Sequence, residues 1–200
     1  MHLELQARLR LGVSSCLAGE AVRYDGKDKR DHWLVDRLGC FSELLSFCPE
    51  AVLGIPRETV SLNRDAKGSL RVLGNESGTD VTDRIDAHIQ PWLDTQDLDA
   101  LDGWVFKARS PSCGVQPVEV REAGQPAGRA PGRFATAVLD RCAWLPAIDE
   151  DQLADPAQRR HFLERAFARA SWREFVRELP TDERARDAAV AAWLERYELL

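Results

Sequence analysis

Three of the five cysteines in the chain follow short apolar segments that are typical of buried strands. They are Cys16 after residues 9–13, Cys48 after 41–47, and Cys113 in the Ser-Pro-Ser-Cys-Gly loop after 103–107. In an open α/β sheet the carboxyl ends of parallel strands line one crevice, where ligands bind. We therefore expect three thiols that are far apart in the sequence to meet at one point.

The chemistry of three converging thiols is that of a soft metal site. Thiolate ligands favour zinc, copper(I) or an iron–sulfur cluster, and the absence of a CxxC pair argues against a zinc ribbon or a thioredoxin motif. A four-iron cluster normally takes four cysteines, so three would leave one iron open, as in catalytic metal sites. The alternative is that some of the five cysteines are buried and pack as small apolar side chains. That alternative suits Cys40 and Cys142 better, because neither lies in a Ser/Pro/Gly loop.

The composition suits a globular protein of 200 residues, 44% of them hydrophobic, with one α/β domain and at most a small appendage. A net charge of −6 argues against a protein that binds nucleic acid over its whole surface. No apolar run reaches membrane-span length, and the first residues lack the form of a secretory signal. We expect a cytoplasmic protein with reduced cysteines and no membrane partner.

The segments that must position the cysteines predict an α/β fold with a Rossmann-like open, mostly parallel sheet. The expected strands are 9–13, 41–47, 70–73, 104–107 and 115–120, and the expected helices are 31–38, 134–139 and one that begins at Thr79-Asp80. The apolar face of that last helix is Val81, Ile85, Ile89, Trp92 and Leu93. Residues 123–132, rich in Gly, Pro and Arg, are expected to form a mobile loop.

A short helical appendage is predicted after a change of composition near Pro146, which divides the chain into residues 1–147 and 148–200. Asp155 and Pro156 predict the start of a helix with an apolar side at Phe162, Leu163, Ala166, Phe167 and Ala170. A second helix is expected to open at Thr181 and to bury Ala188, Ala192 and Trp193. Two such helices either dock on the α/β domain or begin a longer helical domain.

Several short motifs stand out in order along the chain: Val13–Glu20 with Arg23–Gly26, Cys48-Pro49-Glu50, Pro56-Arg57-Glu58, Gly78–Thr82 and Lys107–Gly114. With these motifs, the chain resembles the thiouracil and thiouridine desulfidase family over residues 9–145. The resemblance implies a Rossmann-like domain with a 4Fe–4S cluster held by Cys16, Cys48 and Cys113, one iron not being bound by the protein. It also implies an enzyme that replaces the thiocarbonyl sulfur of thiouracil-type bases with oxygen, without net redox change.

The C-terminal segment 153–178 is similar to the start of a helical domain that is fused to some family members. Those fusions are associated with removing sulfur from 4-thiouridine in transfer RNA. The expected partner is therefore a thiolated uracil base, a nucleotide or a tRNA. Arginines between residues 159 and 177 could contact RNA phosphates, but interleaved acids favour a solvated helix face.

Six further residues are candidates for the site. Glu50, two residues from Cys48, could move protons as a general base, and Ser110 could act as a proton relay. Ser112 could contact substrate or bond the loop backbone. Tyr24 and Asp25 could stack on and bond a base, or simply form the turn, and Lys107 could receive a phosphate or remain solvated.

Two other functions fit the same residues. One is sulfur transfer into a substrate, which would need a sulfur donor, although no ATP-binding glycine motif is present. The other is a nucleic-acid-binding module stabilised by zinc or an iron–sulfur cluster. Such a module would be favoured if Cys40 or Cys142 supplied a fourth ligand, since a complete shell leaves no open metal position.

Overall fold

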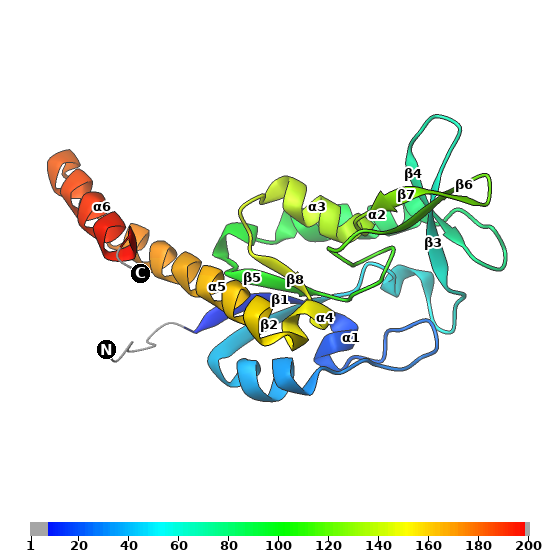
Figure 1. Ribbon diagram of the computed structural model, residues 1–200, viewed down its shortest axis with the longest axis horizontal. Coiled ribbons are helices and arrows are strands. Elements are labelled where there is room, and N and C mark those ends of the chain that lie inside the picture. The colour runs from blue at the N-terminus through cyan, green and yellow to red at the C-terminus, as the bar shows by residue number, and fades with distance from the viewer. Residues whose placement is uncertain (1–7, 199–200) are drawn as a thin grey trace.

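The structure, a computed structural model, describes residues 8–198. Its centre is a sheet of four parallel strands in the order β2-β1-β5-β8, so the α/β fold with a parallel sheet is confirmed (Figure 1). The strands are β1 Leu9–Ser14, β2 Ser42–Phe47, β5 Gly103–Phe106 and β8 Ala147–Asp149. Because all four run the same way, their carboxyl ends lie along one edge.

Alternation along β5 divides the apolar side chains between two cores, one on each face of this sheet. Trp104 and Phe106 pack with α2 (Thr82–Thr95) and α3 (Arg133–Arg141), and Val105 packs on the other face with residues of β1 and α5 (Pro156–Arg177). Gly12 makes room for this arrangement. A Cβ there would lie 1.9 Å from the indole of Trp104, so only glycine lets that ring cross β1.

A second sheet, which the sequence analysis did not predict, lies beside the α2/α3 layer (Figure 1). Its order is β4-β3-β6-β7, formed by β3 Val60–Arg64, β4 Leu70–Gly74, β6 Val118–Glu122 and β7 Gln125–Ala130. The expected mobile loop at 123–132 is wrong, because most of it is β7. Ala123 and Gly124 have φ of 49° and 81°, the pair of positive values that a tight hairpin turn between β6 and β7 requires.

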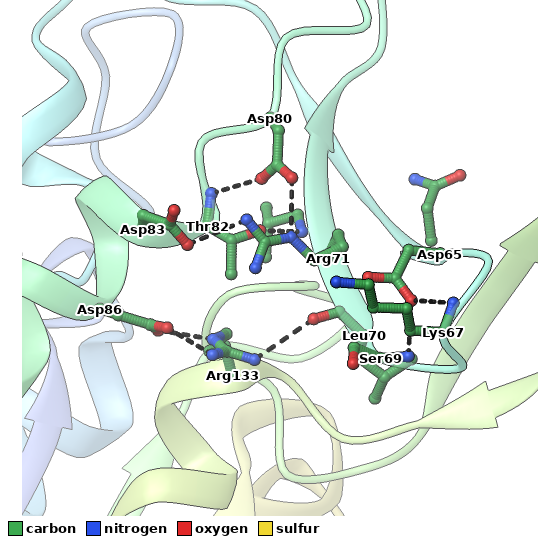
Figure 2. Close-up of polar contacts among 12 residues, drawn as sticks. Asp65, Lys67, Ser69, Leu70, Arg71, Asp80, Thr82, Asp83, Asp86 and Arg133 are labelled. Carbon is green, nitrogen blue, oxygen red and sulfur yellow. Dashed lines mark hydrogen bonds and ion pairs between the residues drawn. The ribbon is translucent and has the colours of Figure 1, made fainter.

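Two arginines join this second sheet to the helices (Figure 2). Arg71 of β4 donates to Asp80 at 2.7 Å and to Asp83 at 2.9 Å. Arg133, the first residue of α3, pairs with Asp86 of α2 and donates to the carbonyl of Leu70 at 3.4 Å. The second sheet is thereby fixed relative to α3, whose first turn supports the Cys113 loop described below.

Short helices fill the remaining connections of the α/β body. They are α1 Ser15–Ala18, the π-helix η1 Trp33–Arg37, α4 Glu150–Ala154, and the 3₁₀ turns η2 Leu38–Phe41, η3 Ala51–Leu53 and η4 Leu98–Ala100. The expected helix over 31–38 is therefore a π-helix followed by a 3₁₀ turn, with Gly39 inside that turn. No helix within 8–198 has the length and apolarity needed to cross a bilayer.

The helix α5 packs directly on the central sheet. Asp155 caps it, as predicted, by accepting the N–H groups of Ala157 and Gln158, each at 2.9 Å. Phe162 lies so close to Gly103 that a Cβ at Gly103 would be 2.9 Å from the ring. The first turns of the predicted appendage are therefore part of the core, and the division at residue 148 stays a prediction.

Within the part of the chain that the structure describes, the helix α6 (Glu183–Glu198) packs against the far end of α5, which extends past the body of the protein (Figure 1). The ring of Trp193 is 4.7 Å from that of Trp172. Ala188 and Ala192 are exposed, so the predicted buried stripe on this helix is wrong at both positions. The two helices hold each other by aromatic contacts, and the alanines remain in contact with solvent.

Candidate metal centre

Cys16, Cys48 and Cys113 lie at the carboxyl ends of three adjacent strands. Cys48 directly follows β2, Cys16 lies in α1 just after β1, and Cys113 lies in the turn after β5. Burial, followed by the charge of Cys48, raises the pKa of Cys16 to about 11. Burial also raises the pKa of Cys113 well above its usual range, with contributions from both other thiols. The three side chains are thus within electrostatic reach of one another at one edge of the sheet.

Each sulfur has a neighbour that favours its ionised form, although burial outweighs it; for Cys16 these neighbours are the positive charges of Lys107 and Arg23. The pKa of Cys48 rises to about 11 through burial and the Glu50 charge, against hydrogen bonds from the N–H groups of Glu50 and Ala51. A hydrogen bond from Ser110 likewise opposes the rise at Cys113. Three thiolates so near one another, two of them buried and Cys48 half-buried, require a cation, and metal coordination deprotonates thiols outright. The donor set therefore fits a positively charged metal group.

The donor set is compatible with more than one kind of metal group. Within residues 8–198, no three Cys, His, Asp or Glu side chains are already arranged as a site for a single metal ion. Cysteine thiolates hold both zinc ions and iron–sulfur clusters, so the three thiols fit either group by their chemistry.

The loop that carries Cys113 rests on the first turn of α3. The N–H of Cys113 bonds the hydroxyl oxygen of Ser110 at 3.1 Å. Three loop carbonyls accept from the start of α3: Gly114 from Gly132 at 2.7 Å, Pro111 from Arg133 at 3.0 Å, and Ser112 from Phe134 at 2.8 Å. These bonds satisfy N–H groups that a helix start leaves without intrahelical partners. Helix α3 thus sets the position of the cysteine loop.

Two consecutive carboxylates at the end of β8 hold the same loop at both ends. Asp149 accepts the N–H groups of Val115 and Gln116, each at 2.9 Å. Glu150 accepts the N–H of Ala108 and pairs with the ammonium group of Lys107. The sequence analysis missed both residues. The available signal was an Asp-Glu pair between a short apolar run and a helix start.

Glu50 and Ser110, the predicted proton-handling residues, both lie beside the sulfurs. The charge of Glu50 contributes to the raised pKa of both Cys48 and Cys113. Its carboxylate accepts a hydrogen bond from Arg57 Nε at 3.0 Å, and this carboxylate and guanidinium have only 15% and 8% of their side-chain surfaces exposed. Arg57 is a further site residue that the sequence analysis quoted in a motif without assigning it a role.

The loop after Cys16 places Tyr24 and Asp25 at the surface. Tyr24 is 39% exposed, and the guanidinium of Arg23 lies 5.4 Å from its ring centroid. Asp25 accepts the N–H of Lys27 at 3.2 Å and is paired with Arg23 at 3.4 Å. Asp25 therefore stabilises its own turn, and the exposed face of the Tyr24 ring is the part of this loop that a ligand could contact.

Lys107 and Ser112 differ in how fully their polar atoms are used. Lys107 is mostly buried, and its ammonium group already bonds Glu150 and the carbonyl of Ala108. Ser112 is fully buried, and its hydroxyl has no hydrogen-bond partner within residues 8–198. Burying a hydroxyl without a hydrogen-bond partner costs folding free energy. The Ser112 hydroxyl could therefore form a hydrogen bond with a group bound at this loop.

Cys40 and Cys142 lie apart from the three converging cysteines. Cys142 Sγ is 3.5 Å from Arg169 and 3.7 Å from Asp99, near the start of β5, whereas Cys113 follows the end of that strand. Cys40 is exposed, and its thiol donates to the carbonyl of Asp36 at 3.3 Å. Neither cysteine is placed to complete a shell of four thiolates.

Two hollows border the Cys113 loop. One has a volume of about 400 Å³ and is lined by Pro111 together with Ser61, Asn75 and Arg121 of the second sheet and its turns. The other, of about 320 Å³, includes Arg109 and the residues around Asp149. Both have the size of ordinary small-molecule sites, and both are bounded in part by the loop that follows β5.

Comparison with known proteins gives two matches. The profile of a family described as 2-thiouracil desulfurase matches residues 11–150. A solved structure described as the 4Fe–4S-dependent thiouracil desulfidase TudS is 33% identical, with a TM-score of 0.55; the match covers 74% of this chain and 95% of that one. No curated protein matches the chain.

Proposed function

The chain belongs to the 2-thiouracil desulfurase family, and we propose that it removes sulfur from the thiocarbonyl group of thiouracil-type substrates. The observation that carries this proposal is the meeting of Cys16, Cys48 and Cys113 at the ends of three adjacent parallel strands. We propose that these residues hold a 4Fe–4S cluster, with one iron not bound by the protein. The printed description of the similar solved structure names the same type of cluster.

The cluster would supply a single function to this site. When bound, a cluster with one iron free of protein ligands offers a Lewis-acid position suited to sulfur. Cys16, Cys48 and Cys113 would be committed as ligands and unable to move protons. Other side chains must therefore activate water and account for the protons.

Glu50 and Ser110 are the residues we assign to proton movement. Glu50 would take a proton from the attacking water as general base. Ser110, which bonds both the N–H of Cys113 and its sulfur, would position the substrate or relay the proton. The reaction then balances as thiocarbonyl plus water giving carbonyl plus hydrogen sulfide. No electrons are exchanged, so it is hydrolase-like and needs no electron donor.

The substrate is proposed to be a thiolated uracil, as the free base, a nucleotide or a residue of tRNA. The exposed ring of Tyr24 could stack on the base, and Asp25 and Ser112 are the remaining polar candidates for contact with it. Lys107 would contribute positive charge beside Cys16 while paired with Glu150. Five free thiols suit a reducing compartment such as the cytoplasm.

The division of the chain into a desulfidase domain and a helical segment from residue 148 is also a proposal. The contribution of this segment is tested by a truncation that removes α6 and leaves α5, since α5 packs in the core. If the segment contributes to RNA binding, the truncated enzyme keeps its rate on 2-thiouracil and loses rate on thiolated tRNA. Equal rates on both substrates would remove that role.

The main experiment compares reconstituted variants on 2-thiouracil, 4-thiouridine monophosphate and thiolated tRNA, by sulfide release and iron content. Glu50→Gln should keep its iron and lose about 10²–10⁴-fold in rate, and Ser110→Ala should lose less. Glu43→Gln, an exposed carboxylate on β2, is the matched control. Normal turnover by Glu50→Gln with full iron would disprove the base assignment, and no turnover by the unaltered protein would favour a binding module.

A further inference from the structure

Arg57 distributes its side-chain donors over two different loops. Nε donates to Glu50 Oε2 at 3.0 Å, one terminal nitrogen donates to the carbonyl of Gly54 at 2.9 Å, and the other to the carbonyl of Val22 at 2.9 Å. Its backbone N–H bonds the carbonyl of Tyr24 at 3.0 Å. A single residue thus joins the loop that follows Cys48 to the loop that follows Cys16.

The contact with Arg57 determines where the Glu50 carboxylate lies. Among residues 8–198, Arg57 is the hydrogen-bond partner of that carboxylate and no second one is present. The pair is largely buried beside the cysteines. Removing one partner of a buried ion pair leaves the charge of the other uncompensated. Without the guanidinium, the carboxylate has no bond that holds it toward the sulfurs.

Arginine is suited to this position in a way that lysine is not. Its planar guanidinium presents five N–H donors in a fixed fork, so three separate acceptors can be held at once. A lysine ammonium at the end of a flexible chain could satisfy Glu50 or one carbonyl, but would not hold both loops in the same relation. The loop after Cys16 also carries Tyr24 and Asp25, which are candidates for contact with the base in the proposed function.

We propose that Arg57 is the positioning residue of this active site: it aims the Glu50 carboxylate and fixes the loops after Cys16 and Cys48 relative to each other. The proposal rests on the proposed function, in which Glu50 is the general base. Arg57 itself touches neither substrate nor metal ligand in this assignment. Its effect on the reaction is exerted through Glu50, because holding the loop after Cys48 against the loop after Cys16 keeps that carboxylate in place.

The kinetic test uses reconstituted Arg57→Gln, Arg57→Lys, Glu50→Gln and the double variant Glu50→Gln/Arg57→Gln, with 2-thiouracil as substrate. We expect Arg57→Gln to keep its iron content and absorption spectrum and to lose about 10–10²-fold in kcat with KM little changed, as a misplaced catalytic group does. The double variant should be no slower than Glu50→Gln, because residues that act through one another are not additive. Arg64→Gln, whose side chain donates to the carbonyl of Gly68 in an exposed turn, should be unaffected.

Three kinetic results would overturn the proposal. They are an unchanged kcat in Arg57→Gln, losses that multiply in the double variant, and a slow Arg57→Gln beside a fully active Glu50→Gln. The last result would also remove Glu50 as the base, whereas either of the first two leaves the base assignment intact. Failure of the proposal and failure of the proposed function are therefore distinguishable.

A second readout does not depend on turnover or on Arg57→Gln being folded. In Arg57→Lys, hydrogen exchange of the segments 20–26 and 50–56 should both become faster, because both loops lose a shared bond. Exchange in the Arg64→Gln control should match the unaltered protein in both segments. If Arg57→Lys leaves either segment at its original rate, Arg57 does not couple the two loops.

Discussion

Replacing Gly132 with alanine should displace the Cys113 loop without otherwise changing the protein. Gly132 has φ −66° and ψ 153°, an ordinary conformation for alanine, so the backbone itself is not strained by the change. The added Cβ would lie 2.7 Å from the nitrogen of Gly114 and the carbonyl oxygen of Ser110, and 2.8 Å from the nitrogen of Cys113. All three are backbone atoms, which cannot rotate away as a side chain does.

The size of the effect follows from these distances. Ordinary contact begins near 3.4 Å, so the loop must move by about 0.7 Å from the shortest contacts. Overpacking of this kind costs about 1–3 kcal/mol of stability. A catalytic group misplaced by about 1 Å loses on the order of 10²-fold in rate, so we expect a 10- to 100-fold loss of turnover in the reconstituted variant.

The assay measures iron retention in the presence of a chelator, sulfide release from 2-thiouracil and the thermal midpoint, side by side. Gly39→Ala is the matched control, because a Cβ there meets its nearest atom at an ordinary 3.5 Å. Gly132→Ala should release iron faster and turn over more slowly than this control. If it retains iron and activity like the unaltered protein, the packing of the loop on α3 does not set the position of Cys113.

Three further predictions concern other parts of the fold. Phe162→Ala should lower the free energy of unfolding, measured by urea titration, by about 3–5 kcal/mol, because the ring is buried against Gly103. Trp144→Ala, at an exposed ring, is the control. If Phe162→Ala loses less stability than this control, α5 is not part of the core. Asp149→Asn replaces one of the two acceptor oxygens with an NH₂ group, which would face one of the two N–H donors. Hydrogen exchange of segment 107–116 should therefore become faster, and unchanged exchange would contradict this role. The Ser77 hydroxyl and the N–H groups of Ser77 and Glu76 lower the pKa of Glu58 below its ordinary 4.5. The stabilisation that these hydrogen bonds give to the folded state is therefore present above pH 4.5 and lost as the pH falls through the lowered pKa. Glu58→Gln should reduce the difference in unfolding free energy between pH 7 and pH 3, and an unchanged difference would contradict this role of Glu58.

The parts of the fold that the sequence predicts best are those with local signals. Apolar runs followed by cysteine loops predicted the ends of β1, β2 and β5, and an Asp-Pro pair predicted the start of α5. The buried side of α2 followed from helical spacing, with Ile85, Ile89 and Leu93 fully inside. Since parallel strands share one polarity, the convergence of the three cysteines could be predicted from those strands alone.

The features that the sequence analysis missed depend on contacts between distant segments. The second sheet needs β3 to pair with β6, more than fifty residues later, and β7 contains Gly and Pro, which propensity assigns to loops. From the sequence, Lys107 could be a solvated cation or a phosphate contact, and its pairing with Glu150 is visible only in the folded structure. For α6, helical spacing predicted a buried stripe, but in the described residues this helix packs against the end of α5 through aromatic rings and leaves Ala188 and Ala192 exposed.

The strand order β2-β1-β5 also has a consequence for the order of events in the cell. The cysteines are 32 and 65 positions apart in the sequence, and no two form a chelating pair within one segment. They come together only after β1 has paired with a neighbour on each side. A small zinc domain can use its metal to drive folding, but here the sheet must assemble first. Loading of the proposed cluster would therefore follow assembly of the sheet, and a chain whose sheet is incomplete would offer no preassembled site.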